Sequence, residues 1–462
     1  MIKDIVAAIC MWLALASVLP LYGQQKKENT LGSLWSQVEE NYPGIGVKKI
    51  AINAVELNAK AVKSTHLPQV KTQFQNTYGT YEGSAGAFFP QPGFFNVSGN
   101  PGALEGSSLA ANSFASATVE WELFTFGRLK KENEVAETLV QKKVSEQDAY
   151  ILNLKKVLSE RYITLLYNHA KLEWSKKNTE RLDDIRKISS GLAASGLKPT
   201  ADSLLATSSY VQAMGEYDKW NGNKYASYIK LQELYGQDTV MYSSSIRHFS
   251  APMESQDVNA SQGINDSHPI LAALGKQVQY YTQSGEAQKR AAMPSLKLLG
   301  GYAYRGTGVN SNGKSSSAWQ DGFRNNTNNM LVGIGITWNI TSLYTNRLKG
   351  KGLNEEANSA KLLQTQYQDA MEADLSASQT KSHWQYKQLQ KSQIAVKQAQ
   401  DAYCMYLARY KSGLITLSEL LQIRILLEQA ENNHIEASRS YWMLLAYESE
   451  LTANFDYLFN NL

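Results

Sequence analysis

The chain has 462 residues, a formal charge of +4 from 46 basic and 42 acidic side chains, and 43% hydrophobic residues. This apolar content excludes a wholly disordered chain. The scattered, nearly balanced charge lacks the basic surface of a dedicated nucleic-acid-binding protein. Two cysteines, Cys10 and Cys404, are too few for a disulfide framework or a four-thiolate metal site.

The N-terminus has the features of a secretory signal peptide. Lys3 is followed by an apolar run over residues 5–19 and by the small residue Gly23, so we expect residues 1–23 to be removed by cleavage after Gly23. An uncleaved anchor is the alternative, although the run is shorter than the roughly 20 residues of a membrane-spanning helix. Beyond residue 23 no window reaches the 18 apolar residues typical of a transmembrane helix.

The rest of the chain consists of two copies of one unit. In each copy two prolines lie 25 residues apart, and a tryptophan precedes a glycine by 75 residues. These markers are Pro43, Pro68, Trp121 and Gly196 in the first copy and Pro269, Pro294, Trp338 and Gly413 in the second. We therefore predict a first repeat over residues 24–236, a polar linker over 237–265 and a second repeat over 266–462.

Each repeat begins with a helix and two strands. In the first repeat we expect a helix over residues 34–66, which ends before Pro68 because the residue before a proline resists helical geometry. The alternating segments 69–81 and 114–124 predict strands, and the Gly- and Ser-rich residues 83–112 predict a long loop between them. The second strand places apolar and polar side chains on opposite faces. The apolar set is Ala115, Ala117, Val119, Trp121 and Leu123, and the polar set is Ser116, Thr118, Glu120 and Glu122.

Two matching strands are expected in the second repeat, over residues 295–305 and 331–339. Strands of about 9 to 11 residues have the length that crosses a bilayer when tilted. Aromatic residues near both strand ends are typical of the two interfacial girdles of a membrane barrel. These residues are Tyr78, Tyr302 and Tyr304 toward the loops and Trp121 and Trp338 toward the helices. A soluble antiparallel sheet is the alternative interpretation.

Very long helices follow the second strand of each repeat. Residues 128–190 contain neither proline nor glycine, and their apolar positions step by threes and fours, as in a coiled-coil seam. At 1.5 Å per residue about 60 residues give a helix of roughly 90 Å, and residues 345–411 predict a second one. Because a membrane barrel has at least 8 strands, four strands per chain predict oligomerisation.

These features together resemble the TolC-like outer membrane efflux proteins. The resemblance rests on the duplicated unit, the strand endings at residues 119–128 and 335–339, and a Ser-Gly-Leu triplet in each repeat, and it covers nearly the whole mature chain. The triplets are Ser195, Gly196, Leu197 and Ser412, Gly413, Leu414. The resemblance implies long helices joined to a membrane β-barrel: a homotrimer with a 12-stranded barrel in outer-membrane lipid, continued by an α-helical barrel across the periplasm.

The resemblance also implies a function and partners. The chain would be the exit duct of a tripartite efflux or type I secretion system, docked by a periplasmic adaptor and an inner-membrane pump or ABC transporter through the two triplet tips. A periplasmic gate would contain Tyr410, Asp202 and Glu419. A further acid common in the family, nine residues after the second glycine, is Gln422 here. The residues alone allow a simpler alternative. Gly196 and Gly413 would be turn glycines, and Asp202 and Glu419 would stabilise the N-terminus of the helix that follows each turn.

Enzymatic and cofactor-dependent functions have little support in the sequence. Residues 308–315 match the phosphate-binding pattern Gly-x-x-x-x-Gly-Lys-Ser, but no helical pattern follows to direct amide groups at phosphate. The six histidines are dispersed and none forms a pair at metal-ligand spacing. We therefore expect no enzyme, no metal and no cofactor. The alternative to an export duct is an exported helical scaffold or adhesin, whose strands would not enter lipid.

Overall fold

The computed structural model describes most of the chain and divides it into two compact units. The described residues are 30–80, 105–106, 109–236, 243–252, 264, 267–312 and 314–462. Within them, unit 1 contains residues up to 46 together with 149–268 and 368–462, and unit 2 contains 47–148 and 269–367. Each unit thus combines pieces of both predicted repeats. The predicted signal peptide and most of the 83–112 loop lie outside the described residues.

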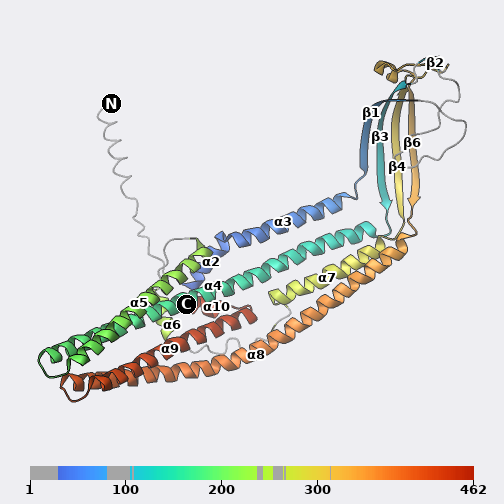
Figure 1. Cartoon of the computed structure of the whole chain (residues 1–462). Helices are drawn as coiled ribbons and strands as arrows, with labels where there is room; N and C mark the ends of the chain where they lie inside the picture. The colour runs from blue at the N-terminus through green and yellow to red at the C-terminus, as the bar shows by residue number, and fades with distance from the viewer. Residues whose placement is uncertain are drawn as a thin grey trace, which may run out of the picture. The chain divides into compact units, whose positions relative to one another are not determined.

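Unit 2 contains a four-stranded antiparallel sheet in which the strands lie side by side in the order β1, β3, β4, β6 (Figure 1). The strands are β1 (Gln69–Thr80), β3 (Leu109–Phe124), β4 (Ser295–Thr307) and β6 (Thr327–Thr337). All four predicted strands are confirmed, although β3 and β6 begin earlier than expected. The early residues are Leu-Ala-Ala-Asn-Ser in β3 and Thr-Asn-Asn-Met in β6, and neither segment alternates apolar with polar side chains.

A second, smaller sheet lies in the same unit, beyond the loop end of the strands. β2 (Glu105–Gly106) pairs in parallel with β5 (Lys314–Ser315), and the 3-10 helix η1 (Trp319–Phe323) follows. Lys314 of the phosphate-loop-like pattern is therefore in a strand and not at the start of an α-helix. In the described residues the next helix is the short 3-10 helix η1, so the α-helical N-terminus that phosphate-binding loops use does not follow Lys314 there.

The predicted long helices are present. They are α4 (Arg128–Ala194) and α8 (Ser342–Lys411), and each is followed across a short turn by a shorter partner, α5 (Thr200–Tyr235) after α4 and α9 (Leu417–Leu451) after α8. Figure 1 shows that each pair folds back as a helical hairpin. The helix α7 (Pro269–Arg290) precedes β4 in the second repeat. Among the described residues, no helix combines the length and the apolar character needed to cross a membrane.

The expectation of a single helix over residues 34–66 is wrong. The segment forms α2 (Leu31–Asn41) and α3 (Pro43–Ser64), separated by Tyr42 in an extended conformation. Proline lacks a backbone N–H but fits the first position of a helix, so Pro43 begins α3 and cannot continue α2. The Ser33 amide donates to Thr30 Oγ1 over 3.3 Å and caps the start of α2.

The predicted polar linker contains a helix. α6 (Ser243–Ser250) packs against α9 in unit 1, where the Trp442 indole N–H donates to the Phe249 carbonyl oxygen over 3.1 Å. His434 Nε2 lies 3.1 Å from the Ser250 carbonyl oxygen. The chain ends in α10 (Asp456–Asn461). The core of unit 1 contains large side chains that are fully buried, among them Trp442, Tyr441, Tyr162, Phe249 and Leu166.

Candidate functional site

The four-stranded sheet has one apolar and one polar face. Residues directly opposite each other in antiparallel strands point to the same side, and the row Val70, Val119, Gly300, Val332 runs across all four strands. The apolar face continues along β6 through Met330, Val332, Ile334 and Ile336, whose side chains are 67–80% exposed. So much exposed apolar surface along one strand marks contact with lipid or a partner.

The opposite face of the sheet contains polar and charged side chains. Lys71 lies opposite Thr118, which lies opposite Gly301, and this row ends in the exposed apolar side chain of Leu331. Near the helices, the Lys297 ammonium contacts Glu120 at 2.5 Å and Glu122 at 3.6 Å, and Glu122 also pairs with Arg128. Glu120 and Glu122 therefore share the polar face, as predicted, and are held by a cation from the neighbouring strand. A water-facing surface fits this composition.

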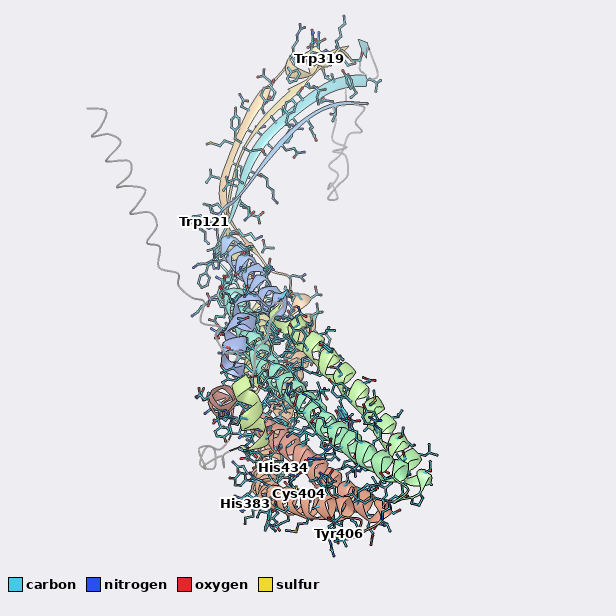
Figure 2. All side chains as sticks on the ribbon, turned by 90° about the vertical axis from the view of Figure 1, so that its left-hand side faces the viewer. Trp121, Trp319, His383, Cys404, Tyr406 and His434 are labelled. Carbon is cyan, nitrogen blue, oxygen red and sulfur yellow. The ribbon has the colours of Figure 1, made fainter. Side chains whose placement is uncertain are left out.

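The two tryptophans predicted at the membrane interface occupy equivalent positions. The Trp121 indole N–H donates to the His66 carbonyl oxygen over 2.9 Å, and the Trp338 N–H donates to the Ala292 carbonyl oxygen over 3.1 Å. Each acceptor lies two residues before the proline that precedes the first strand of its repeat. Figure 2 shows Trp121 at the helix end of the sheet and Trp319 of η1 at the other end. Each tryptophan thus fixes the bend between helix and strand.

The three predicted interfacial tyrosines lie toward the other end of the strands. Tyr78 of β1 and Tyr302 of β4 are more than half exposed. The Tyr304 hydroxyl donates to the Phe323 carbonyl oxygen over 2.8 Å and attaches η1 to the sheet. A role of these residues in lipid contact stays a prediction.

The two Ser-Gly-Leu tips form the same turn between paired helices in unit 1. Gly196 and Gly413 have φ of +72° and +75°, the left-handed conformation that glycine adopts without strain. Leu197 N–H donates to the Leu192 carbonyl and Leu414 N–H to the Arg409 carbonyl, both over 3.0 Å, which completes a Schellman motif at each helix end. The hydroxyls of Ser195 and Ser412 donate to carbonyls four residues earlier.

The side chain after each turn glycine is presented to solvent. Leu197 and Leu414 are both 71% exposed, which is high for leucine. Lys198 joins the two tips, because its ammonium donates to the Ile415 carbonyl oxygen over 3.2 Å. The two hairpins thus end in one surface with a leucine from each repeat.

The two predicted gate acids have different environments. Glu419 forms a capping box at the start of α9: its carboxylate accepts from the Thr416 amide over 2.7 Å, and the Glu419 amide donates to Thr416 Oγ1 over 3.2 Å. These bonds from Thr416 hold the pKa of Glu419 below its ordinary value. Asp202 lies in the first turn of α5, where the N-cap Pro199 offers no side-chain bond.

Tyr410 requires a correction. As a residue of the predicted gate, Tyr410 would lie at an exposed helical tip. Its side chain is instead fully buried in a cluster with Leu182, Ile185, Tyr403 and Leu417. Burial follows from the seven-residue spacing of Tyr403 and Tyr410, which places both on the packed side of α8. That spacing was the signal in the sequence. Its hydroxyl has no hydrogen-bond partner among the described residues.

Ion pairs that the sequence did not predict connect the two hairpins. The Arg181 guanidinium of α4 forms two bonds with the Glu431 carboxylate of α9, over 2.5 and 2.7 Å. Nearer the other end of α9, the buried Lys171 ammonium lies 2.8 Å from Glu436. Although burial acts to raise the pKa of Glu436, its bonds with Lys171 and Tyr167 hold that pKa below the ordinary value.

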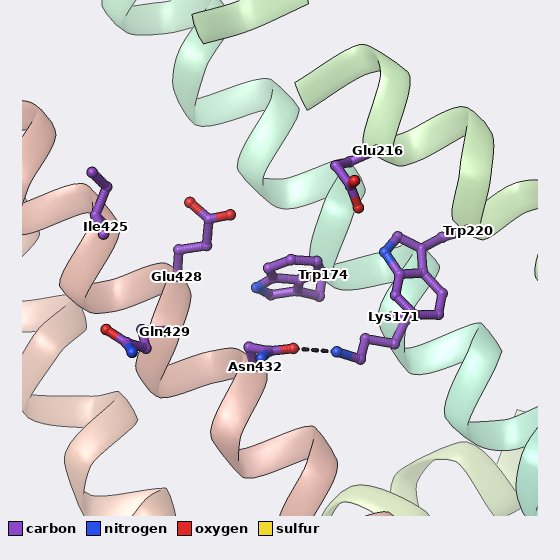
Figure 3. A pocket seen from close by; sticks show the side chains of 8 residues that line it. All are labelled: Lys171, Trp174, Glu216, Trp220, Ile425, Glu428, Gln429 and Asn432. Atoms are coloured by element: carbon purple, nitrogen blue, oxygen red, sulfur yellow. Dashed lines mark hydrogen bonds between the residues drawn. The ribbon is translucent and has the colours of Figure 1, made fainter. Parts of the chain in front are cut away.

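A pocket of about 460 Å³ adjoins Lys171 (Figure 3). The Lys171 ammonium lies 5.4, 5.3 and 5.0 Å from the ring centres of Tyr167, Trp174 and Trp220 and bonds to Asn432. Figure 3 shows this bond joining α4 to α9. Aromatic faces attract a cation, so the buried charge is well compensated. The arrangement stabilises packing of the hairpins and contains no group poised for reaction.

Comparison with known proteins identifies the family. The model of the family described as "Outer membrane efflux protein" matches residues 34–237 and 261–443. The chain belongs to this family. Since the family transports molecules across the outer membrane, the prediction that the chain is an efflux protein of this membrane and not an enzyme is confirmed. So is the prediction of a helical extension in the periplasm. No curated protein sequence matches the chain significantly.

Solved structures of outer membrane proteins share the fold. VceC of Vibrio cholerae is 13% identical with a TM-score of 0.71, over 92% of this chain and 96% of that one. CmeC of Campylobacter jejuni, an outer membrane channel, is 13% identical with a TM-score of 0.71, over 94% and 89%. The open state of the MtrE channel of Neisseria gonorrhoeae is 14% identical with a TM-score of 0.68, over 92% and 89%. The TolC-like fold is thereby confirmed.

Proposed function

We propose that this efflux protein is a homotrimer whose twelve strands close a water-filled channel through the outer membrane. In the described sheet, β1 and β6 each have one neighbour and therefore one open edge. Open edges cannot persist in lipid, where backbone polar groups find no water. Two copies would supply 8 strands, whose interior is filled by side chains, whereas three supply 12 and leave room for a passage.

The observation that carries this proposal is the division of the sheet into a mainly apolar and a mainly polar face, although Leu299 and Leu331 also lie on the polar face. The apolar face of β6 would contact lipid, and the polar face with Lys71, Thr118 and Lys297 would line water. An exported scaffold or adhesin has no use for such an exposed apolar face. That alternative also predicts release from membranes by alkali, whereas a channel requires detergent.

Mass measurement tests the assembly directly. Light scattering of the detergent-purified protein, corrected for bound detergent, should give three chains per particle. A mass of one or two chains would overturn the proposed twelve-stranded channel.

The leucines of the two tips are suited to an apolar partner, and we assign them to docking of a periplasmic adaptor. The adaptor would connect the channel to an inner-membrane pump or ABC transporter, which selects the substrate. Leu197→Ser with Leu414→Ser should abolish efflux of a fluorescent dye from cells while leaving conductance in planar bilayers intact. Ile229→Ser on α5 is the matched control, since Ile229 is similarly exposed but about eight helical turns from the tip. Equal loss in the control would contradict the assignment.

The gate is proposed for the same tips. Three copies of Asp202 and Glu419 would form rings of carboxylates where the helices end, and such rings favour cations. Within a single chain, Tyr410 packs in the buried cluster that contains Leu417 and so stabilises the hairpin near its tip. Its hydroxyl would join the gate only through a neighbouring chain.

A further inference from the structure

A pocket of about 340 Å³ lies in unit 2 where α7 ends and α8 begins. It combines two cationic side chains and a phenol with apolar groups. Its lining residues, which we name the basic-aromatic pocket, are Lys289, Ala292, Met293, Leu343, Tyr344 and Arg347. Apart from Ala292, whose carbonyl oxygen accepts from Trp338, these residues have no role in the function proposed above.

Close packing of the two helices builds the pocket. A Cβ added at Gly350 of α8 would lie 3.1 Å from Lys289 Cγ and 3.2 Å from the Gly285 carbonyl oxygen. Gln288 Nε2 donates to Asn346 Oδ1 over 2.8 Å and fixes the same contact. The aliphatic part of Lys289 therefore packs over Gly350, which holds its ammonium at the wall of the pocket.

The pocket lies next to the apolar face of the sheet. Trp338 lies directly after the end of β6, two residues beyond Ile336 of the apolar face. Its indole N–H donates to the carbonyl oxygen of Ala292, a lining residue. Tryptophan is enriched at the level of lipid headgroups. Tyr344, which also lines the pocket, is 72% exposed. The pocket is thus placed where the membrane face of the sheet meets the helices.

The charges of the pocket suit a phosphate group. Arg347 is exposed, and a guanidinium can bind phosphate through two parallel bonds. Lys289 contacts Glu286 over 2.7 Å, but both side chains are 42% exposed, and exposed pairs of this kind contribute little. Arg290, Lys349 and Lys351 lie in adjoining turns, and every charged side chain within residues 287–294 and 342–354 is basic.

We propose that the basic-aromatic pocket binds the phosphate headgroup of an anionic phospholipid from the periplasmic leaflet of the outer membrane. The apolar residues Met293 and Leu343 would contact the start of the acyl chains, and Tyr344 would lie at the headgroup level. The inference rests on the proposed membrane insertion of the sheet. Free phosphate shares the headgroup chemistry but gains nothing from the apolar lining.

The first repeat supplies a matched control. Lys63 and Lys130 occupy the positions of Lys289 and Arg347, counted from the proline and the tryptophan that mark each repeat. Gly127 stands in place of Tyr344. Both lysines are exposed. Replacing them with alanine therefore removes the same charge as in the pocket, but at a place that has no counterpart of Tyr344.

The test is native mass spectrometry of the detergent-purified full chain titrated with phosphatidylglycerol. We expect one retained lipid per chain in the wild type. Lys289→Ala with Arg347→Ala should weaken binding about 30-fold, or about 2 kcal/mol at 1.4 kcal/mol per tenfold change. The Lys63→Ala, Lys130→Ala control should change binding less than about threefold, on the scale of a nonspecific charge effect. Lys289→Arg, which retains the charge at Lys289 and leaves the Arg347 guanidinium in place, should also stay within about threefold.

Three results would overturn the inference: an unchanged affinity in the alanine double variant, an equal loss in the control, or inorganic phosphate binding as tightly as the lipid. Failure of the underlying channel proposal is separately visible. In that case wild type and all variants would fail to float with liposomes, whereas failure of the lipid site alone leaves flotation intact.

Discussion

The two hairpin tips share a backbone but differ in the side chains around it. Both turns use a glycine with positive φ and the same pair of backbone hydrogen bonds. Three residues before the glycine, however, the first tip has Ala193 and the second has the buried Tyr410. Only the second tip has a capping box, through Thr416 and Glu419. Both repeats therefore keep the glycine that the turn requires. Only the second tip adds a buried aromatic side chain, Tyr410, and a carboxylate held by hydrogen bonds, that of Glu419.

The largest expected effect comes from Tyr410. Because its ring is fully buried, Tyr410→Ala should destabilise the helical hairpins by about 3–5 kcal/mol, measured by thermal or denaturant unfolding of the purified protein. Ala193→Gly, at the equivalent position, should cost only about 1 kcal/mol. Comparable losses would show that the two tips are packed alike.

Tyr410→Phe separates packing from gating. Since the hydroxyl has no partner among the described residues, its removal should leave unfolding unchanged or slightly favour the folded state. If the hydroxyl bonds to a neighbouring chain in the trimer, resting conductance in planar bilayers should rise. Unchanged conductance would remove Tyr410 from the gate.

The next largest effects are expected at the turn glycines. Because the two turns have the same backbone, substitutions of Gly196 and Gly413 should destabilise the protein equally. Gly196→Ala and Gly413→Ala force an L-residue into the left-handed region and should each cost about 1–2 kcal/mol in the free energy of unfolding. Gly191 lies within α4 and has open space where an added Cβ would lie, so it is the control. Gly191→Ala should stabilise by up to about 1 kcal/mol. Unequal costs at Gly196 and Gly413 would break the equivalence of the turns.

The capping box should make the second tip the more sensitive one to both mutation and acid. Thr416→Ala should cost about 1 kcal/mol, whereas Pro199 offers no corresponding bond in the first tip. The pKa of Glu419 is lowered in the folded state, so its contribution is present above the unfolded value near 4.5 and is lost as pH falls through the folded pKa. Glu419→Gln should remove this dependence of Tm on pH. A Tm profile identical to wild type would contradict the cap.

The smallest effect is expected on ion selectivity. Asp202→Ala with Glu419→Ala removes two carboxylates per chain from the tips and should lower the cation selectivity measured from reversal potentials in planar bilayers. Glu216→Ala with Asp401→Ala removes the same charge elsewhere on the hairpins and should leave selectivity unchanged. Equal cation selectivity in both variants and the wild type would contradict a role of Asp202 and Glu419 in the gate. The two acids would then only stabilise the starts of α5 and α9.

Local patterns in the sequence predicted most of the fold. Alternation identified the four strands, and the absence of proline from 128–190 predicted α4. The break at Pro43 was missed because proline at the first helical position resembles helix continuation. The bonds of Arg181 to Glu431 and of Lys171 to Glu436 could not be predicted, because a charge within a helix does not specify a partner some 250 residues away. The burial of Tyr410 follows from its seven-residue spacing from Tyr403, which places both side chains on the packed side of α8 although Tyr410 is close to the turn.

The central claim is that one face of the sheet contacts lipid and the other contacts water. Single cysteines along β6 test it most directly, in the Cys404→Ser background, since Cys404 is the free, exposed thiol of the described chain. In liposomes, cysteines at Leu331, Gly333 and Gly335 should react with a water-soluble maleimide, while those at Val332, Ile334 and Ile336 should be protected and should react with a lipid-soluble reagent. This period of two along the strand is the predicted result. Equal reactivity at all six positions would show that the sheet does not span the membrane.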